Sequence, residues 1–205
     1  MGIKDNLETL RKEIGKAKLV VVSKGRSVDQ LKECYSLGQR IFGENRVQEA
    51  VEKISELGDI AKQISWHMIG HLQRGKVKQA VEIFDVIQSV DTLKLAEKIN
   101  NVASEAGKEQ QIMLQVNVSE DDGKFGFGVG EVEENVRKVK EMKNLELIGL
   151  MAITSMENKR EDFKAMKILF DKFDLQFLSM GMSDSYQVAI TEGANMVRVG
   201  SLIFD

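Results

Sequence analysis

Eight short apolar runs alternate along the chain with longer segments of helical period, and this alternation limits the possible folds more than any other feature. The runs are rich in β-branched residues and cover residues 18–23, 39–43, 65–70, 84–90, 111–117, 145–153, 175–181 and 195–200. Buried parallel strands are typically near-continuous apolar runs of this length. The pattern therefore predicts eight parallel strands.

The segments between the runs carry apolar residues three and four positions apart, as in Val132, Val136 and Val139. Such segments form helices with one apolar face, which must cover a sheet. One further helix is expected over residues 3–16, ahead of the first strand, with Asp5 as a candidate cap near its start.

Strict alternation of eight strands with helices predicts an α/β fold, a single (β/α)8 barrel of the TIM type. We expect one domain over residues 1–205, with an extra N-terminal helix within 1–17. A doubly wound open sheet is the alternative, although it would rarely need eight parallel strands in a chain of 205 residues.

Composition indicates a soluble globular protein and no general nucleic-acid binder. The chain has 29 basic and 32 acidic residues, a net charge of −3 and 42% apolar residues. A general nucleic-acid binder is not expected, because such domains usually carry a basic surplus. We expect neither a membrane span, which needs about 20 apolar residues, nor a signal peptide, which needs an unbroken apolar stretch near the N-terminus.

The chain has a single cysteine, Cys34, which excludes a disulfide framework and is expected to be a packed thiol. These features together favour a cytoplasmic protein.

In a barrel of this kind, active-site residues lie on the loops that follow the carboxyl ends of the strands. The residues that follow the predicted strands are therefore the candidates. They are Lys24, 43–45, 70–71, 89–91, Asn117, Thr154, 181–183 and 200–201.

Small residues follow the last two predicted strands, where barrels commonly bind phosphate. The segments are Gly181-Met182-Ser183 and Gly200-Ser201. Glycine lets the backbone approach an anion closely, while amide N–H groups and a serine hydroxyl can donate hydrogen bonds to it. Both segments would also suit ordinary turns, and the sequence leaves the two interpretations open.

Lys24 follows the first predicted strand, so its Cα is expected at the mouth of the barrel. A lysine that is partly desolvated there can attack an aldehyde to form a Schiff base. A solvated loop lysine is the plain alternative. With a phosphate site across the mouth, the lysine would suit a ligand that carries both an aldehyde and a phosphate, such as pyridoxal phosphate or a sugar-phosphate aldol substrate.

Arg198 lies inside the last predicted strand, on the face of Met196 and Gly200. An arginine in an apolar strand is costly to bury without partners, so it indicates either a site or an ion pair.

Two other features receive structural interpretations. His67 falls in a strand and His71 in a loop, so their spacing is not that of metal ligands on one helix, and no metal site is expected. The glycine-rich residues 123–130 match no nucleotide-binding pattern and are expected to form a flexible loop over the mouth.

Taken together, the motifs resemble those of the YggS/PROSC family, the pyridoxal phosphate homeostasis proteins. The resemblance runs in order from residue 18 to the C-terminus. The segments that carry it are VVVSK (20–24), FGENRVQE (42–49), WHMIGHLQ (66–73), SVD (89–91), GLMAI (149–153), GMSDS (181–185) and VRVGSLIF (197–204).

The resemblance implies a single barrel, related to the N-terminal domain of bacterial alanine racemase, that holds pyridoxal 5'-phosphate. By position, Lys24 matches the lysine that forms the Schiff base with the cofactor. Ser183, Gly200 and Ser201 match the phosphate-binding positions. Ser201 stands where many members have threonine, which keeps the hydroxyl.

The resemblance also assigns Arg198 to the arginine that faces the pyridine nitrogen, and Asn45 to a residue beside the ring. A cation there keeps the nitrogen unprotonated, which makes the ring a weaker electron sink. A racemase would in addition need a second base, a tyrosine in the resembling racemases. Of the two tyrosines, Tyr35 falls in a predicted outer helix, and Tyr186 would have to reach back from a helix start.

The function implied is reversible binding of pyridoxal phosphate on Lys24 in intracellular vitamin B6 homeostasis. The protein would buffer the cofactor or deliver it to apo-enzymes, with no robust catalytic reaction of its own. A weak pyridoxal phosphate-dependent amino-acid racemase is the alternative, and a Schiff-base aldolase or sugar-phosphate isomerase is a more distant one. The helices show no heptad pattern and the family permits a monomer, which we expect.

Overall fold

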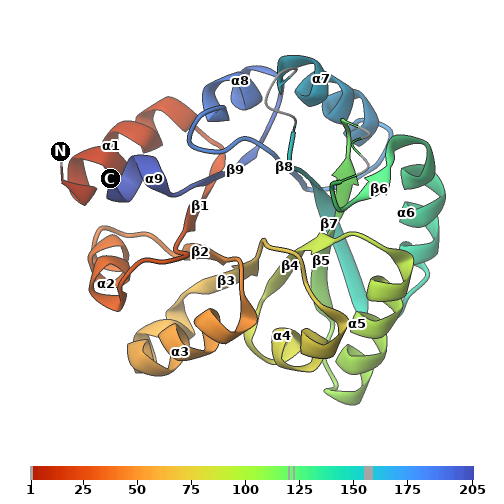
Figure 1. Ribbon diagram of the computed structural model, residues 1–205, viewed down its shortest axis with the longest axis horizontal. Coiled ribbons are helices and arrows are strands. Elements are labelled where there is room, and N and C mark those ends of the chain that lie inside the picture. Colours follow the sequence, from red (N-terminus) through yellow and green to blue (C-terminus); the bar gives the residue numbers. More distant parts are fainter. Residues whose placement is uncertain (1, 120, 122, 155–158) are drawn as a thin grey trace.

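The computed structural model describes residues 2–119, 121, 123–154 and 159–205. Within these residues, eight parallel strands close into a barrel surrounded by helices (Figure 1). The strands pair in the order β1-β2-β3-β4-β5-β7-β8-β9, and pairing of β9 with β1 completes the ring. This arrangement confirms the predicted (β/α)8 barrel and rules out the open sheet.

The observed elements follow the predicted alternation. The barrel strands are β1 (Lys18–Val22), β2 (Ile41–Glu44), β3 (Ser65–Met68), β4 (Val86–Val90), β5 (Gln110–Asn117), β7 (Leu145–Ala152), β8 (Phe177–Ser179) and β9 (Met196–Val199). The helices are α1 (Ile3–Ile14), α2 (Val28–Ser36), α3 (Val47–Leu57), α4 (Val77–Ile83), α5 (Leu93–Glu105), α6 (Val132–Lys140), α7 (Lys159–Phe170), α8 (Tyr186–Thr191) and α9 (Ser201–Phe204). Among the described helices, none is long and apolar enough to cross a membrane.

The extra helix α1 takes the place in the outer ring beside β1, next to α2, α8 and the short α9 (Figure 1). The Asn6 side chain donates a hydrogen bond to the Ile203 carbonyl at 3.2 Å, which ties the two chain ends together. The suggestion that Asp5 caps this helix was wrong. The helix begins at Ile3 after Gly2, without a side-chain cap, and Asp5 lies within its first turn.

Two apolar layers hold the barrel. A large cluster lies between the strands and the helices, and it includes Cys34, which is fully buried as expected. Burial raises the pKa of the Cys34 thiol to about 12, so the thiol stays protonated and unreactive. A smaller, methionine-containing cluster comprises Val20, Val86, Met113, Ile148, Met151 and Met196.

Residues 123–130 do not form only the loop that the sequence predicted. Phe127 and Gly128 form a ninth short strand, β6 (Phe127–Gly128), in parallel pairing with the end of β5. Phe127 is buried, whereas Phe125 is exposed and stacks on the His71 ring, with 3.7 Å between the two ring centroids. The segment is therefore anchored by β6 and contacts the loop that follows β3.

Candidate functional site

Lys24 lies at the mouth of the barrel, two residues after β1, in a tight turn. The N–H of Arg26 donates to the Ser23 carbonyl at 3.0 Å, and Gly25 adopts a φ of +69°. A positive φ at the third position is typical of a type II turn and favours glycine there. The Lys24 side chain is exposed. The protein alone thus does not supply the partial desolvation that the sequence argument invoked.

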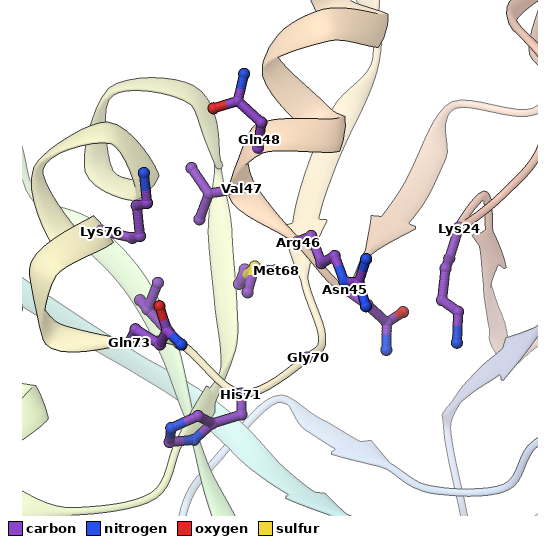
Figure 2. A pocket seen from close by; sticks show the side chains of 11 residues that line it. Lys24, Asn45, Arg46, Val47, Gln48, Met68, Gly70, His71, Gln73 and Lys76 are labelled. Carbon is purple, nitrogen blue, oxygen red and sulfur yellow. The ribbon is translucent and has the colours of Figure 1, made fainter.

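Lys24 and Asn45 border a cavity of about 490 Å³ at this mouth (Figure 2). In Figure 2, the Lys24 amine and the Asn45 amide extend in the same direction from neighbouring loops. Asn45 directly follows β2, and its Oδ1 is buried with no hydrogen-bond partner within the described part of the chain. The other lining residues are Arg46, Val47, Gln48, Met68, Gly70, His71, Leu72, Gln73 and Lys76.

The loops after β8 and β9 meet beside the turn that carries Lys24. The Gly200 N–H donates to Ser183 Oγ at 3.4 Å. Gly200 also lies close to the end of β1, because a Cβ at this position would be 3.0 Å from the Val22 carbonyl oxygen. Ser201 is exposed at the start of α9. The structure therefore brings these three predicted phosphate-site residues together, next to Lys24.

Arg198 lies in β9, two residues before Gly200, with only 4% of its surface exposed. One guanidinium nitrogen donates to Ser179, to its carbonyl at 2.9 Å and its Oγ at 2.8 Å, and the other to the Ala152 carbonyl at 2.9 Å. Burial lowers the Arg198 pKa to about 10, which leaves the group cationic at neutral pH. Its hydrogen-bond partners are neutral, and no ion pair joins it to a carboxylate of the residues described.

Arg198 begins a chain of buried hydrogen bonds that sequence analysis missed. Ser179 Oγ donates to Gln88 Oε1 at 2.6 Å, and Gln88 Nε2 lies 2.7 Å from His67 Nδ1. Burial lowers the His67 pKa to about 3, so this ring is neutral and its Nδ1 accepts from Gln88. The available signal for the three residues beyond Arg198 was that each is a polar residue inside an apolar strand run: Ser179 in 175–181, Gln88 in 84–90 and His67 in 65–70.

His71 occupies a different position, on the wall of the cavity rather than in this chain. Its Nδ1 lies 2.8 Å from Oδ2 of Asp91, a buried carboxylate that follows β4. Within the described ranges, no group of three His, Cys, Asp or Glu side chains could hold a metal ion.

The two tyrosines have partners outside the cavity. The Tyr35 hydroxyl donates to Gln63 at 2.7 Å, and the Tyr186 hydroxyl donates to Glu13 on α1. Burial and the neighbouring Glu13 carboxylate raise the Tyr186 pKa to about 12. Both phenol hydroxyls are therefore engaged by side chains that do not line the cavity.

The site thus offers an exposed primary amine, a buried cation without a counter-charge and a serine- and glycine-containing turn, all on the adjacent strands β8, β9 and β1. An amine can attack a carbonyl, a buried cation can hold an acceptor, and the turn can donate hydrogen bonds to an anion.

Comparison with known proteins agrees with this chemistry. Residues 2–205 match the family model of the alanine racemase N-terminal domain. A relative from Pasteurella multocida, named pyridoxal phosphate homeostasis protein, is 34% identical over 226 aligned positions that cover 100% of this chain and 97% of the relative. A relative of the same name from Synechocystis is 36% identical over 197 positions, covering 91% of this chain and 90% of the relative.

Solved structures give the same result. PipY of Synechococcus elongatus with pyridoxal phosphate bound superposes with a TM-score of 0.91 at 33% identity, over 99% of this chain and 100% of PipY. An alanine racemase from Clostridium difficile has a TM-score of 0.82 at 14% identity, over 98% of this chain and 56% of that one, which shows a shared fold. The chain therefore belongs to the family of pyridoxal phosphate homeostasis proteins, which is built on the alanine racemase N-terminal domain.

Proposed function

We propose that this protein binds pyridoxal phosphate covalently and reversibly on Lys24, and that it buffers the cofactor or delivers it to apo-enzymes in the cytoplasm. The observation that carries the proposal is the buried, uncompensated cation of Arg198 on β9, next to the strand that leads to Lys24. The names of the relatives and the pyridoxal phosphate bound in PipY support it.

The residues present fit this cofactor. The cofactor supplies an aldehyde that combines with a primary amine to form a Schiff base. Lys24 Nζ would form the bond to the aldehyde carbon and give up two protons, which leave with the aldehyde oxygen as water. Lys24 is exposed, so the cofactor can reach it from solvent, and the water can leave.

The other predicted residues would hold the remaining parts of the ligand. Arg198 would donate to the pyridine nitrogen, a neutral acceptor for a cation that has no counter-charge in the described structure. Ser183, Gly200 and Ser201 would hold the phosphate with their hydroxyl and N–H groups. Asn45 would line the pocket beside the ring, with its unpartnered Oδ1 available to a donor.

The same arrangement favours binding over turnover. Arg198 would leave the pyridine nitrogen unprotonated and so weaken the ring as an electron sink. A two-base racemase needs a second base, and both tyrosine hydroxyls have partners elsewhere. Weak racemase activity is the alternative, and exchange of the α-proton of alanine for deuterium would reveal it.

The direct test is an absorption spectrum of the purified protein with and without pyridoxal phosphate, followed by borohydride reduction and peptide mapping. The expected result is a visible band that reduction fixes onto the peptide containing Lys24. Lys24→Ala should abolish it, whereas Lys4→Ala, an exposed lysine on α1, should not. A colourless protein, or label on another lysine, would overturn the assignment.

Delivery and assembly need separate measurements. Loaded protein mixed with a pyridoxal phosphate-dependent apo-enzyme, in the presence of a phosphatase that destroys free cofactor, should activate that enzyme. Equal activation by the free cofactor under the same conditions would argue against delivery. Sedimentation equilibrium should show a monomer, and a mass that rises with concentration would contradict this.

A further inference from the structure

A buried ammonium group lies directly beneath the turn that carries Lys24. It belongs to Lys53 on α3, whose side chain is only 9% exposed. Lys53 Nζ donates to the Ser23 carbonyl, to Glu44 Oε1 at 2.7 Å and to Glu49 Oε1 at 2.6 Å. All three hydrogen bonds that an ammonium group can donate are therefore made.

This cluster holds the backbone on both sides of Lys24. On the preceding side, the Ser23 carbonyl accepts from Lys53, and Ser23 Oγ donates to Glu44 Oε1 at 2.7 Å. On the following side, the Gly25 N–H donates to Glu49 Oε1 at 2.6 Å. One ammonium and two carboxylates thus fix the peptide groups that flank the proposed Schiff-base lysine.

Stability of the fold does not require the charges of Lys53, Glu44 and Glu49. Replacing a buried ion pair with apolar side chains of similar volume is often neutral or stabilising, because charges lose hydration on burial. Glu44 shows this loss, because its side chain is fully buried, its Oε2 has no partner in the described structure and burial raises its pKa. What the charges provide here is a defined turn geometry, since hydrogen bonds to charged groups are stronger than neutral ones.

A fixed turn matters because the Lys24 side chain is otherwise unrestrained. It is exposed, and no hydrogen bond or ion pair of its ammonium group is found among the described residues. Its backbone therefore decides which part of the mouth the amine reaches, and small displacements of a reacting group reduce rates strongly.

We propose that Lys53, Glu44 and Glu49 are positioning residues that hold the Lys24 turn in the geometry needed for its amine to combine with the aldehyde. This inference rests on the proposed function of Lys24. It assigns a role to a buried ion cluster whose three members do not line the cavity.

The test compares Glu49→Ala with Glu49→Gln and with a control on the same helix. Alanine removes the acceptor for the Gly25 N–H, glutamine keeps an acceptor oxygen, and Glu56→Ala removes an exposed carboxylate of the same helix. Glu49 is suitable because it is partly exposed, with 24% of its side chain accessible. Lys53→Met leaves Glu44 buried without its cation and can fail to fold, so the Glu49 variants carry the test, with Lys53→Arg as a conservative second variant.

The first measurement needs no cofactor. Hydrogen exchange of the Gly25 amide, followed by NMR on the unloaded protein, should be about tenfold faster in Glu49→Ala, as expected for the loss of one hydrogen bond to a charged group. Glu49→Gln should recover most of the protection, and Glu56→Ala should leave it unchanged. Equal exchange in wild type and Glu49→Ala would overturn the proposed hold on the turn.

The second measurement concerns the lysine itself. With pyridoxal phosphate present, borohydride trapping on Lys24 should be about tenfold slower in Glu49→Ala, matching the loss of that hydrogen bond. Wild-type trapping at Lys24 together with unchanged trapping in Glu49→Ala would overturn the positioning role and leave the proposed function standing. Absence of trapping at Lys24 in the wild type would overturn the proposed function itself, while the exchange measurement would still report on the turn.

Discussion

At the scale of single residues, we expect Arg198 to contribute more to cofactor binding than to the stability of the unloaded protein. Its guanidinium is buried on three neutral oxygen acceptors. Arg198→Met leaves these acceptors without their donor, a cost that is partly offset because a charge without a counter-charge is no longer buried. We therefore expect Arg198→Met to lower the free energy of unfolding of the unloaded protein by about 1 kcal/mol and to weaken pyridoxal phosphate binding about tenfold.

Urea unfolding without cofactor and a spectroscopic titration with it measure these two effects separately. Arg137→Met, which removes an exposed arginine of α6, is the matched control and should change neither. A loss of several kcal/mol of stability in Arg198→Met would show that the arginine is structural.

His67 makes the stability of the protein depend on pH. Burial lowers its pKa to about 3 in the folded state, against an ordinary value of 6.5 for histidine. Below pH 6.5 the unfolded chain binds a proton that the folded protein rejects, so stability falls as the pH drops from 6.5 towards 3. At pH 5 this loss is about 2 kcal/mol relative to neutral pH.

Urea unfolding of wild type and His67→Gln at pH 7 and pH 5 isolates this contribution, because the other titrating groups are common to both. The glutamine variant should lose about 2 kcal/mol less between the two pH values. His71→Gln is the control. It leaves the buried His67 ring in place, so its stability should fall between pH 7 and pH 5 as much as that of the wild type. Parallel pH profiles for His67→Gln and wild type would contradict the assignment.

At the scale of elements, α1 should matter for stability and not for binding. It fills the outer ring beside β1, and Leu7 on it is fully buried in the core. Leu7→Ala should lower the free energy of unfolding by about 3 kcal/mol, the usual cost of such a truncation. Cofactor affinity of the folded protein should be unchanged, because none of the proposed cofactor-binding residues lies on α1.

Glu8→Ala changes the neighbouring exposed position on α1 and should leave stability within about 0.5 kcal/mol of wild type. A Leu7→Ala protein of normal stability would show that α1 is only loosely docked on the barrel.

The strands and helices were predictable because their signals are local. The run from 18 to 23 and the regular spacing of Val132, Val136 and Val139 each specify one element without reference to the rest of the chain. β6 (Phe127–Gly128) was not predictable in this way. It pairs with Val116 and Asn117 at the carboxyl end of β5, beyond the last pairing of β4 with β5, and that free edge exists only after folding.

The candidate site likewise has features that local sequence predicts and features that depend on the folded structure. The positions of Lys24, Ser183 and Gly200 followed from counting residues past each strand, because the ends of parallel strands share one edge. The exposure of Lys24 and the hydrogen bond from Lys53 to the Ser23 carbonyl depend on contacts between elements, which no local pattern encodes. The buried chain from Arg198 to His67 likewise joins four strands.

At the scale of the whole molecule, the candidate site forms only when the barrel closes. Ser183 and Gly200 come from the C-terminal end of the chain, Lys24 and Asn45 from the N-terminal quarter, and pairing of β9 with β1 brings them together. The same closure is reinforced outside the barrel, where the two chain ends meet at α1 and α9 (Figure 1). A ligand held by residues of both ends would therefore bind the folded barrel and not the open chain.

Binding to the closed barrel alone predicts a thermal shift. A ligand that binds only the folded state, present at 100 times its dissociation constant, adds about 2.7 kcal/mol to the free energy of unfolding. For a domain of this size, that corresponds to a rise in melting temperature of about 8 °C. Differential scanning calorimetry of the protein with and without pyridoxal phosphate measures it.

The controls identify what produces the shift. Inorganic phosphate at the same concentration should shift the melting temperature much less, because it lacks the aldehyde that would join to Lys24 under the proposed function. Lys24→Ala should lose most of the rise and Lys4→Ala should keep it. An equal rise in Lys24→Ala would mean that the cofactor stabilises the barrel without the covalent bond, so that the pairing of β9 with β1 would be secured by the phosphate turn and Arg198 alone.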